Sequence, residues 1–133
     1  MQDLQQWIKA CEDLKLETYV DTTGHLTIGW GHNLADGITQ EMAEFIFQCD
    51  FKQAVSELEQ CDWYNMQPQG VKNALINMNF NLGITKIEGF KKMIAALKIK
   101  DYTTAALESL DSLWAKQVHQ RANDIAVMIR AGK

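Results

Sequence analysis

The sequence predicts an α+β fold that is mostly helical, built from a small β-hairpin lobe, a long connecting helix and a helical lobe. Apolar residues recur at helical spacing along most of the 133 residues, and Pro68 is the only proline. Two strand-favouring stretches, 18–20 and 26–28, lie close together near the start, separated by the turn sequence DTTG. A chain of this length is expected to form one domain. We place the small lobe at 13–38, the connecting helix at 39–60, and the helical lobe at 61–133 together with the first helix.

The first forty residues contain a helix followed by a hairpin. Leu4, Trp7, Ile8 and Cys11 share one helical face, which predicts an amphipathic helix ending near Glu12. Gly24 is the expected turn residue of the hairpin. Gly29 and Gly31 flank a tryptophan, where we expect a positive φ or a close approach of the backbone.

The rest of the chain is expected to be helical. Thr39 is a candidate N-cap of a helix of about 20 residues. Pro68 suits the first turn of a second helix, which stops near Gly83. We expect one further helix around 86–98, another from the N-cap Asp101 to about Leu110, and a last one from about 118 that ends before Gly132.

Charge and composition exclude several functional classes. The net charge is −4 and the isoelectric point is near 5.3, so the chain lacks the basic surface expected of a nucleic-acid-binding protein. No window has the apolar length of a membrane span, and membrane insertion is not expected. The three cysteines do not have metal-ligand spacing. We therefore expect no metal and no cofactor.

Two acids and a hydroxyl surround the hairpin. Glu12 closes the first helix, Asp21 follows the first strand, and the reversal at Gly24 brings Thr27 back alongside that strand. Glycoside hydrolysis uses such a carboxyl pair, with one carboxyl protonated to assist the leaving oxygen and the other ionised. Exposed acids near turns are also common on ordinary surfaces. The spacing alone therefore fits both a catalytic pair and a solvated surface.

The segment from residue 12 to residue 32 closely resembles the catalytic signature of the phage-type, T4-like lysozymes, the muramidase endolysins of glycoside hydrolase family 24. Its fixed positions are Glu12, Tyr19, Asp21, Gly24, Thr27, Ile28, Gly29, Gly31 and His32. The stretches INMNFNLG (76–83) and GF (89–90), and Trp114 followed by Arg121, also resemble the family. The resemblance implies a lysozyme-like two-lobe fold with a cleft between the lobes.

The resemblance assigns roles to residues of the signature. Glu12 would be the general acid, Asp21 the base or electrostatic partner of a water, and Thr27 a residue that positions this water. The family inverts the anomeric carbon, and inverting enzymes keep their carboxyls about 6.5–9.5 Å apart to admit the water. Arg121 would contact Glu12, and His32 with Asp50 would form a buried structural ion pair.

The resemblance also places substrate contacts. Asn33 and Phe80 follow from matched motifs, whereas Met93 and Glu108 rest on spacing alone. Trp30 is the tryptophan most suited to reach the cleft, because it stands in the hairpin between two glycines. The expected partner is the glycan strand of peptidoglycan, bound by a monomer.

Two departures from the family bear on activity. Asp13 follows the catalytic acid at a position where the family commonly has glycine, and aspartate is one of the few residues that tolerate a positive φ there. The connection from His32 to Thr39 is short, which implies a smaller lobe and a more open cleft.

The sequence supports three hypotheses. The first is a muramidase that cleaves the β-1,4 bond between N-acetylmuramic acid and N-acetylglucosamine. The second is a weakened or inactive lysozyme-like module that binds peptidoglycan or a protein. The third, a lytic transglycosylase, would exclude water, and the presence of both Asp21 and Thr27 argues against it. Because the N-terminus does not read as a signal peptide, we expect synthesis in the host bacterial cytoplasm and action on the wall after release or export.

Overall fold

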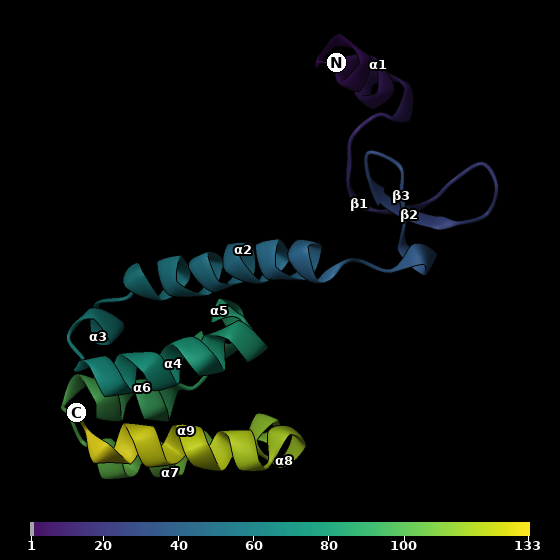
Figure 1. Ribbon diagram of the computed structural model, residues 1–133. Coiled ribbons are helices and arrows are strands. Elements are labelled where there is room, and N and C mark those ends of the chain that lie inside the picture. The colour runs from purple at the N-terminus through teal and green to yellow at the C-terminus, as the bar shows by residue number, and fades with distance from the viewer. Residues whose placement is uncertain (1) are drawn as a thin grey trace. The chain divides into compact units, whose positions relative to one another are not determined.

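The computed structural model describes residues 2–133, and the chain divides into two units, 1–45 and 46–133 (Figure 1). The division falls within helix α2 (Gln40–Glu59), so the first turns of this helix belong to the smaller unit. The predicted grouping of the first helix with the helical lobe depends on how the two units are placed, and it stays a prediction.

The smaller unit consists of a helix and a small antiparallel sheet. Helix α1 (Gln2–Glu12) is followed by strands β1 (Lys15–Val20), β2 (Leu26–Gly29) and β3 (His32–Asn33), and by the 3-10 turn η1 (Leu34–Asp36). The sheet order is β1-β2-β3, and Tyr19 pairs with Thr27 across the hairpin. The helix and both predicted strands are confirmed, whereas the two-residue strand β3 carries no signal that sequence patterns detect.

Asp13 ends α1 in a left-handed conformation with φ 61°. Its backbone N–H donates to the carbonyl of Lys9 at 2.9 Å, which is the hydrogen bond of a left-handed helix C-terminus, where glycine is usual. The side chain contributes a second bond, because its Oδ1 accepts from the N–H of Leu14 at 2.9 Å. Asp13 therefore adopts the positive φ that the sequence analysis considers only as tolerable for aspartate, and this conformation turns the chain from α1 into β1.

The helices that follow begin at the caps that the sequence predicts. The hydroxyl of Thr39 accepts from the N–H of Met42 at 3.2 Å and opens α2, which has the expected 20 residues. Asp101 accepts from the N–H of Thr104 at 3.1 Å and opens α7 (Tyr102–Leu110). Gly132, in the left-handed region at φ 66°, closes the last helix.

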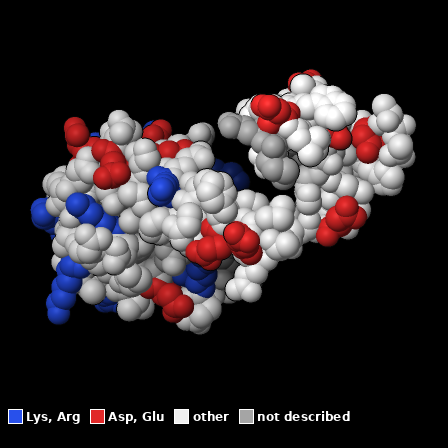
Figure 2. Space-filling view, turned by 45° about the horizontal axis from the view of Figure 1, so that its top comes forward, with Lys and Arg blue, Asp and Glu red and all other residues white. Residues whose placement is uncertain are grey.

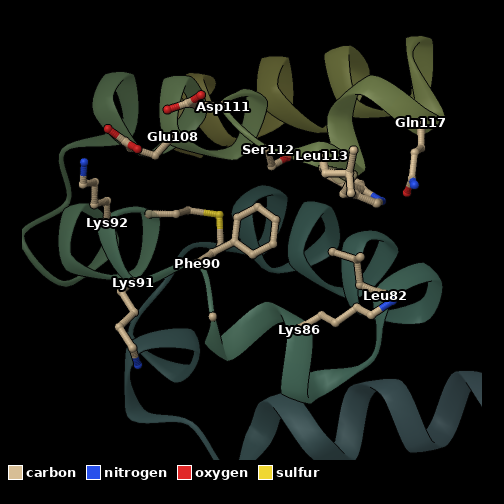
Figure 3. A pocket seen from close by; sticks show the side chains of 13 residues that line it. Leu82, Lys86, Phe90, Lys91, Lys92, Glu108, Asp111, Ser112, Leu113 and Gln117 are labelled. Carbon is tan, nitrogen blue, oxygen red and sulfur yellow. The ribbon is translucent and has the colours of Figure 1, made fainter.

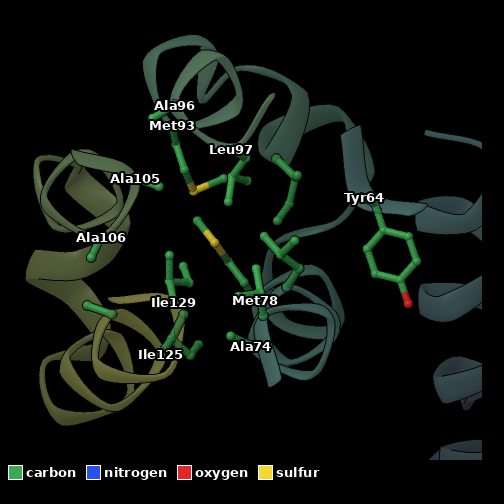
Figure 4. Packing of buried hydrophobic residues seen from close by; sticks show 14 of the residues in the cluster. Tyr64, Ala74, Met78, Met93, Ala96, Leu97, Ala105, Ala106, Ile125 and Ile129 are labelled. Carbon is green, nitrogen blue, oxygen red and sulfur yellow. The ribbon is translucent and has the colours of Figure 1, made fainter. Parts of the chain in front are cut away.

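The larger unit packs short helices around one apolar core. After α2 come α3 (Asp62–Asn65), α4 (Gln69–Leu82), α5 (Ile84–Glu88), α6 (Lys91–Lys98), α7, α8 (Leu113–Val118) and α9 (Gln120–Ala131). Side chains of α4, α6, α7 and α9 converge in this core, among them the fully buried Met78, Met93 and Ile129 (Figure 4). This packing confirms a mostly helical α+β fold.

Two predicted helices are wrong in their extent. The helix expected over 86–98 is two helices, because the N–H groups of Gly89 and Phe90 bond three residues back and end α5. The last helix starts at Gln120, since His119, at φ 46°, separates it from α8. Trp114 of α8 is buried and packs edge-on against Phe90, which lies between α5 and α6. Within residues 2–133, no helix combines the length and apolarity needed to cross a bilayer.

Candidate active site

Glu12 lies at the C-terminal end of α1, and its carboxylate contacts the backbone of Gly31 in the turn between β2 and β3. A Cβ atom at Gly31 would collide with Glu12 Oε2 and lie 2.9 Å from Glu12 Cδ. Gly31 also has φ 77°, which side-chain-bearing residues rarely adopt. The prediction for this glycine is therefore confirmed on both counts, a positive φ and a close approach. The residue that the backbone approaches is the proposed general acid.

Trp30 contributes a second contact between α1 and this turn. The ammonium group of Lys9 lies 4.3 Å from the centre of the Trp30 ring, within the range of a cation–π interaction. Lys9 and Glu12 are three residues apart and share one face of the helix. Two neighbouring residues of the turn, Trp30 and Gly31, therefore contact one face of α1, with the Glu12 carboxylate against Gly31. The substrate contact expected for Trp30 stays a prediction.

Asp21 follows β1, and a set of local donors holds it ionised. Its Oδ1 accepts from the N–H of Thr23 at 2.9 Å, from the Thr23 hydroxyl at 2.9 Å and from the N–H of His25 at 2.8 Å. These bonds lower the pKa of Asp21 below its ordinary 3.8, the His25 N–H bond most and the Thr23 hydroxyl bond next. The proposed base is therefore charged at neutral pH, as its role requires.

Thr27 lies near Asp21 but does not bond to it directly. Thr27 pairs with Tyr19 across the hairpin, and the Thr27 hydroxyl donates to the carbonyl of His25 at 2.8 Å. The residue is only 1% exposed. His25 therefore links the two predicted residues, since its N–H bonds Asp21 and its carbonyl bonds Thr27. Sequence patterns alone assign His25 no role in the site, and the signal that points to it is the segment DTTGH, in which several hydrogen-bond donors closely follow Asp21.

His32 and Asn33 have partners within the smaller unit. His32 Nε2 lies 2.9 Å from the carbonyl oxygen of Gly37, and Asn33 Oδ1 accepts from the N–H of Ala35 at 3.0 Å, capping η1. Asp50 belongs to α2 within the larger unit. The ion pair expected between His32 and Asp50 would join the two units, and it stays a prediction, as does the contact of Asn33 with substrate.

Arg121 bonds to α4 of its own unit. Its Nε donates to Asn77 Oδ1 at 2.8 Å and its Nη2 to the Asn77 carbonyl at 3.2 Å. It lines a pocket of about 440 Å³ with Phe80, whose ring centre lies 5.5 Å from that of Phe47. The structure therefore places Arg121 and Phe80 side by side in one pocket. The contact expected between Arg121 and Glu12 stays a prediction.

Met93 and Glu108 line a second pocket of the larger unit, of about 710 Å³ (Figure 3). Lys92 and Glu108 stand at one end of this pocket and Lys86 at the other, with the ring of Phe90 between them. Met93 is fully buried in the core and exposes no surface of its own to a ligand. The two positions predicted from spacing alone are thus brought together in one pocket, but only Glu108 carries a polar group into it.

The two units differ in charge. Residues 1–45 carry eight carboxylates against two lysines, whereas residues 46–133 carry eleven Lys and Arg against nine carboxylates. Figure 2 shows the basic side chains gathered on the larger unit. In the described part of the chain, no three His, Cys, Asp or Glu side chains are grouped to hold a metal ion.

Comparison with known proteins defines the class to which this fold and site belong. The phage lysozyme family matches residues 9–128, nearly the whole chain. The chain belongs to this family, and its membership supports a lysozyme-type hydrolase with peptidoglycan as substrate.

The chain is similar to several named proteins. It is 28% identical to the probable T4-type lysozyme 2 of Dictyostelium discoideum, over 97% of this chain and 94% of that protein. It is 32% identical to the endolysin of Acyrthosiphon pisum secondary endosymbiont phage 1, over 82% of this chain and 75% of that protein. It is also 25% identical to the pre-baseplate central spike protein Gp5 of Enterobacteria phage T4, over 97% of this chain but 28% of that protein.

Proposed function

We propose that this protein is a muramidase that hydrolyses the β-1,4 bond between N-acetylmuramic acid and N-acetylglucosamine, with inversion at the anomeric carbon. The observation that carries the proposal is the environment of the two carboxyls. Glu12 contacts the backbone of a turn that tolerates only glycine, and Asp21 is held ionised by three hydrogen bonds. A carboxyl that can donate a proton and an ionised partner carboxylate are what glycoside hydrolysis uses.

The proposed reaction is a single displacement by water. Glu12 gives its proton to the glycosidic oxygen as the bond from that oxygen to the anomeric carbon breaks, and the bonding electrons leave with the oxygen. A water attacks the anomeric carbon from the opposite face and gives its proton to Asp21. The single hydrogen of the Thr27 hydroxyl is already donated to the carbonyl of His25. The hydroxyl oxygen can therefore only accept a hydrogen bond from this water.

The larger unit is proposed to bind the glycan and to support the acid. Phe80 and Arg121 share one pocket, in which an aromatic face and a guanidinium group are available to a sugar. Glu108 is proposed to contact the glycan in the other pocket, and the buried Met93 is proposed to shape that pocket from the core. In the smaller unit, Trp30 and Asn33 are proposed to contact sugars next to the cleaved bond. Pairing of Arg121 with Glu12, and of Asp50 with His32, belongs to the same proposal.

Digestion of purified peptidoglycan tests the activity. The wild type should release new reducing ends, and Glu12→Gln and Asp21→Asn should each lower the rate by about 10²- to 10⁴-fold, because each removes one proton-transfer group. Glu17→Gln is the matched control, since it removes an exposed carboxylate of β1 and should leave the rate unchanged. NMR of the first product should show the inverted anomer. Full activity in Glu12→Gln would end the proposal, and 1,6-anhydro products would indicate a transglycosylase.

A second candidate function is wall binding without cleavage. Two observations favour it, the residue Asp13 in the left-handed region next to the acid and the excess of carboxylates in the smaller unit. A wild-type protein that sediments with purified walls but releases no reducing ends over several hours would support binding. Release of reducing ends that depends on Glu12 would exclude it.

A further inference from the structure

The side chain of Thr23 lies between Asp21 and His25. Its Oγ1 is 2.9 Å from Asp21 Oδ1 and 2.6 Å from His25 Nδ1. The imidazole Nδ1 itself is 3.7 Å from the same carboxylate oxygen. The hydroxyl group is therefore in hydrogen-bond contact with both the proposed base and the histidine.

The number of available hydrogens determines the direction of these bonds. A threonine hydroxyl has one hydrogen, so it can donate to Asp21 or to His25 but not to both. A hydrogen bond to an ionised carboxylate is about twice as strong as one between neutral groups, so the hydrogen goes to Asp21. The bond to His25 must then run the other way, with Nδ1 carrying the hydrogen and Thr23 Oγ1 accepting it. This order fixes the tautomer of the imidazole.

We propose that His25 is a positioning residue that acts on Asp21 through Thr23. Its Nδ1–H donates to the Thr23 hydroxyl, and that hydroxyl donates to Asp21 Oδ1. Donation into a hydroxyl polarises it and strengthens the bond that it makes in turn. Because the bonds that hold Asp21 all end on Oδ1, they fix the plane of the carboxylate, and Oδ2 becomes the oxygen that receives the proton of the water. This last step rests on the proposed function, whereas the order of the hydrogen bonds does not.

The imidazole is not needed to close the turn. The backbone of Asp21 donates to the carbonyl of His25 at 2.9 Å, the N–H of Gly24 bonds the carbonyl of Asp21 at 3.1 Å, and the N–H of His25 bonds Asp21 Oδ1 at 2.8 Å. All of these contacts would persist with another side chain at position 25. The imidazole ring itself contacts the Thr23 hydroxyl and approaches the Asp21 carboxylate. These contacts are those expected of a residue that positions Asp21.

The test compares His25→Asn with His25→Phe in the full chain. Asparagine places an N–H at the position of Nδ1 and should preserve the chain of donors, whereas phenylalanine removes the donor and keeps a ring. We expect the pKa of Asp21, followed by NMR of its carboxyl carbon, to rise more in His25→Phe than in His25→Asn, because both variants lose the charge of the imidazole but only phenylalanine also removes the N–H donor. The rate of peptidoglycan hydrolysis should fall by about 2- to 10-fold in His25→Phe alone, the kinetic equivalent of one hydrogen bond.

A direct measurement of the tautomer completes the test. In the wild type at about pH 9, where an ordinary histidine is neutral, nitrogen NMR should show the hydrogen of His25 on Nδ1. A hydrogen on Nε2, or the same Asp21 titration in His25→Phe and His25→Asn, would overturn the proposal. If His25→Phe does not fold, Thr23→Val compared with Thr23→Ser gives the same contrast, because serine keeps the hydroxyl. The NMR results need no substrate, so they stand even if Asp21→Asn retains activity and the proposed function fails.

Discussion

Substitution of Gly31 by alanine tests whether the turn between β2 and β3 positions the proposed general acid. The new Cβ would occupy space now filled by the Glu12 carboxylate, colliding with Oε2 and lying 2.9 Å from Cδ. Real Cβ atoms do not sit this close to other atoms, so either the carboxylate or the turn must move. The carboxylate is the end of a flexible side chain, whereas the turn is held by the paired strands, so we expect the carboxylate to move.

Two separate magnitudes follow from the geometry. The positive φ of 77° at Gly31 costs alanine about 1–2 kcal/mol of folding free energy, whatever space surrounds it. Displacement of a catalytic group by about 1 Å lowers the rate by about 10²-fold. Gly31→Ala should therefore lose modest stability and most of its activity.

Gly29 provides the matched control. It has φ 70°, almost the same as Gly31, but a Cβ there would meet no atom within 4 Å. Gly29→Ala should lose the same 1–2 kcal/mol, measured by urea denaturation, and keep hydrolysis of peptidoglycan within a few-fold of the wild type. Equal loss of activity in both variants would show that backbone strain alone is responsible. Full activity of Gly31→Ala would show that this contact does not position Glu12.

Three further predictions concern stability. Asp13→Gly should raise the free energy of unfolding by up to about 1 kcal/mol, because glycine accepts the φ of 61° without strain. Asp13→Ala should lower the free energy of unfolding. Equal effects of the two substitutions in denaturation experiments would show that the left-handed conformation does not destabilise a non-glycine residue here. The stability that Asp21 contributes is fully present above its unfolded pKa near 3.8 and is lost as the pH falls through its lower folded pKa. The difference in unfolding free energy between the wild type and Asp21→Asn should therefore shrink below about pH 4, and a constant difference down to about pH 2 would refute this linkage. Leu58→Ala, at a fully buried position of α2, should cost about 2–5 kcal/mol. The exposed Leu107→Ala should stay within about 0.5 kcal/mol of the wild type, and similar costs for both leucines would argue against the described core.

The sequence indicates several candidate residues because they lie close together in one segment that resembles the family signature, and their catalytic roles stay predictions. Glu12, Asp21 and Gly31 were identified from residues that lie within one segment of the chain, and the hairpin between them follows from strand propensity and a turn glycine. His25 was missed because its role depends on which atoms its ring meets. That question concerns side-chain geometry, and a one-dimensional pattern does not contain it.

The sequence by itself determined the features that depend on neighbours a few residues apart. The left-handed end of α1 at Asp13, the cap at Thr39 and the glycines of the turn are of this kind, since each follows from the conformational preferences and hydrogen-bonding groups of a single residue. These local rules held wherever the structure tests them.

Only the tertiary structure decided the features that depend on burial against distant segments. The sequence pattern does not place the helix breaks at Gly89 and His119, and it does not show that Trp114 of α8 packs against Phe90, which lies between α5 and α6. The partner of Arg121 within its unit, Asn77, is likewise 44 residues away along the chain. Packing selects among conformations that local preferences leave nearly equal in energy, and the distant segments that do the packing are brought together only by the fold.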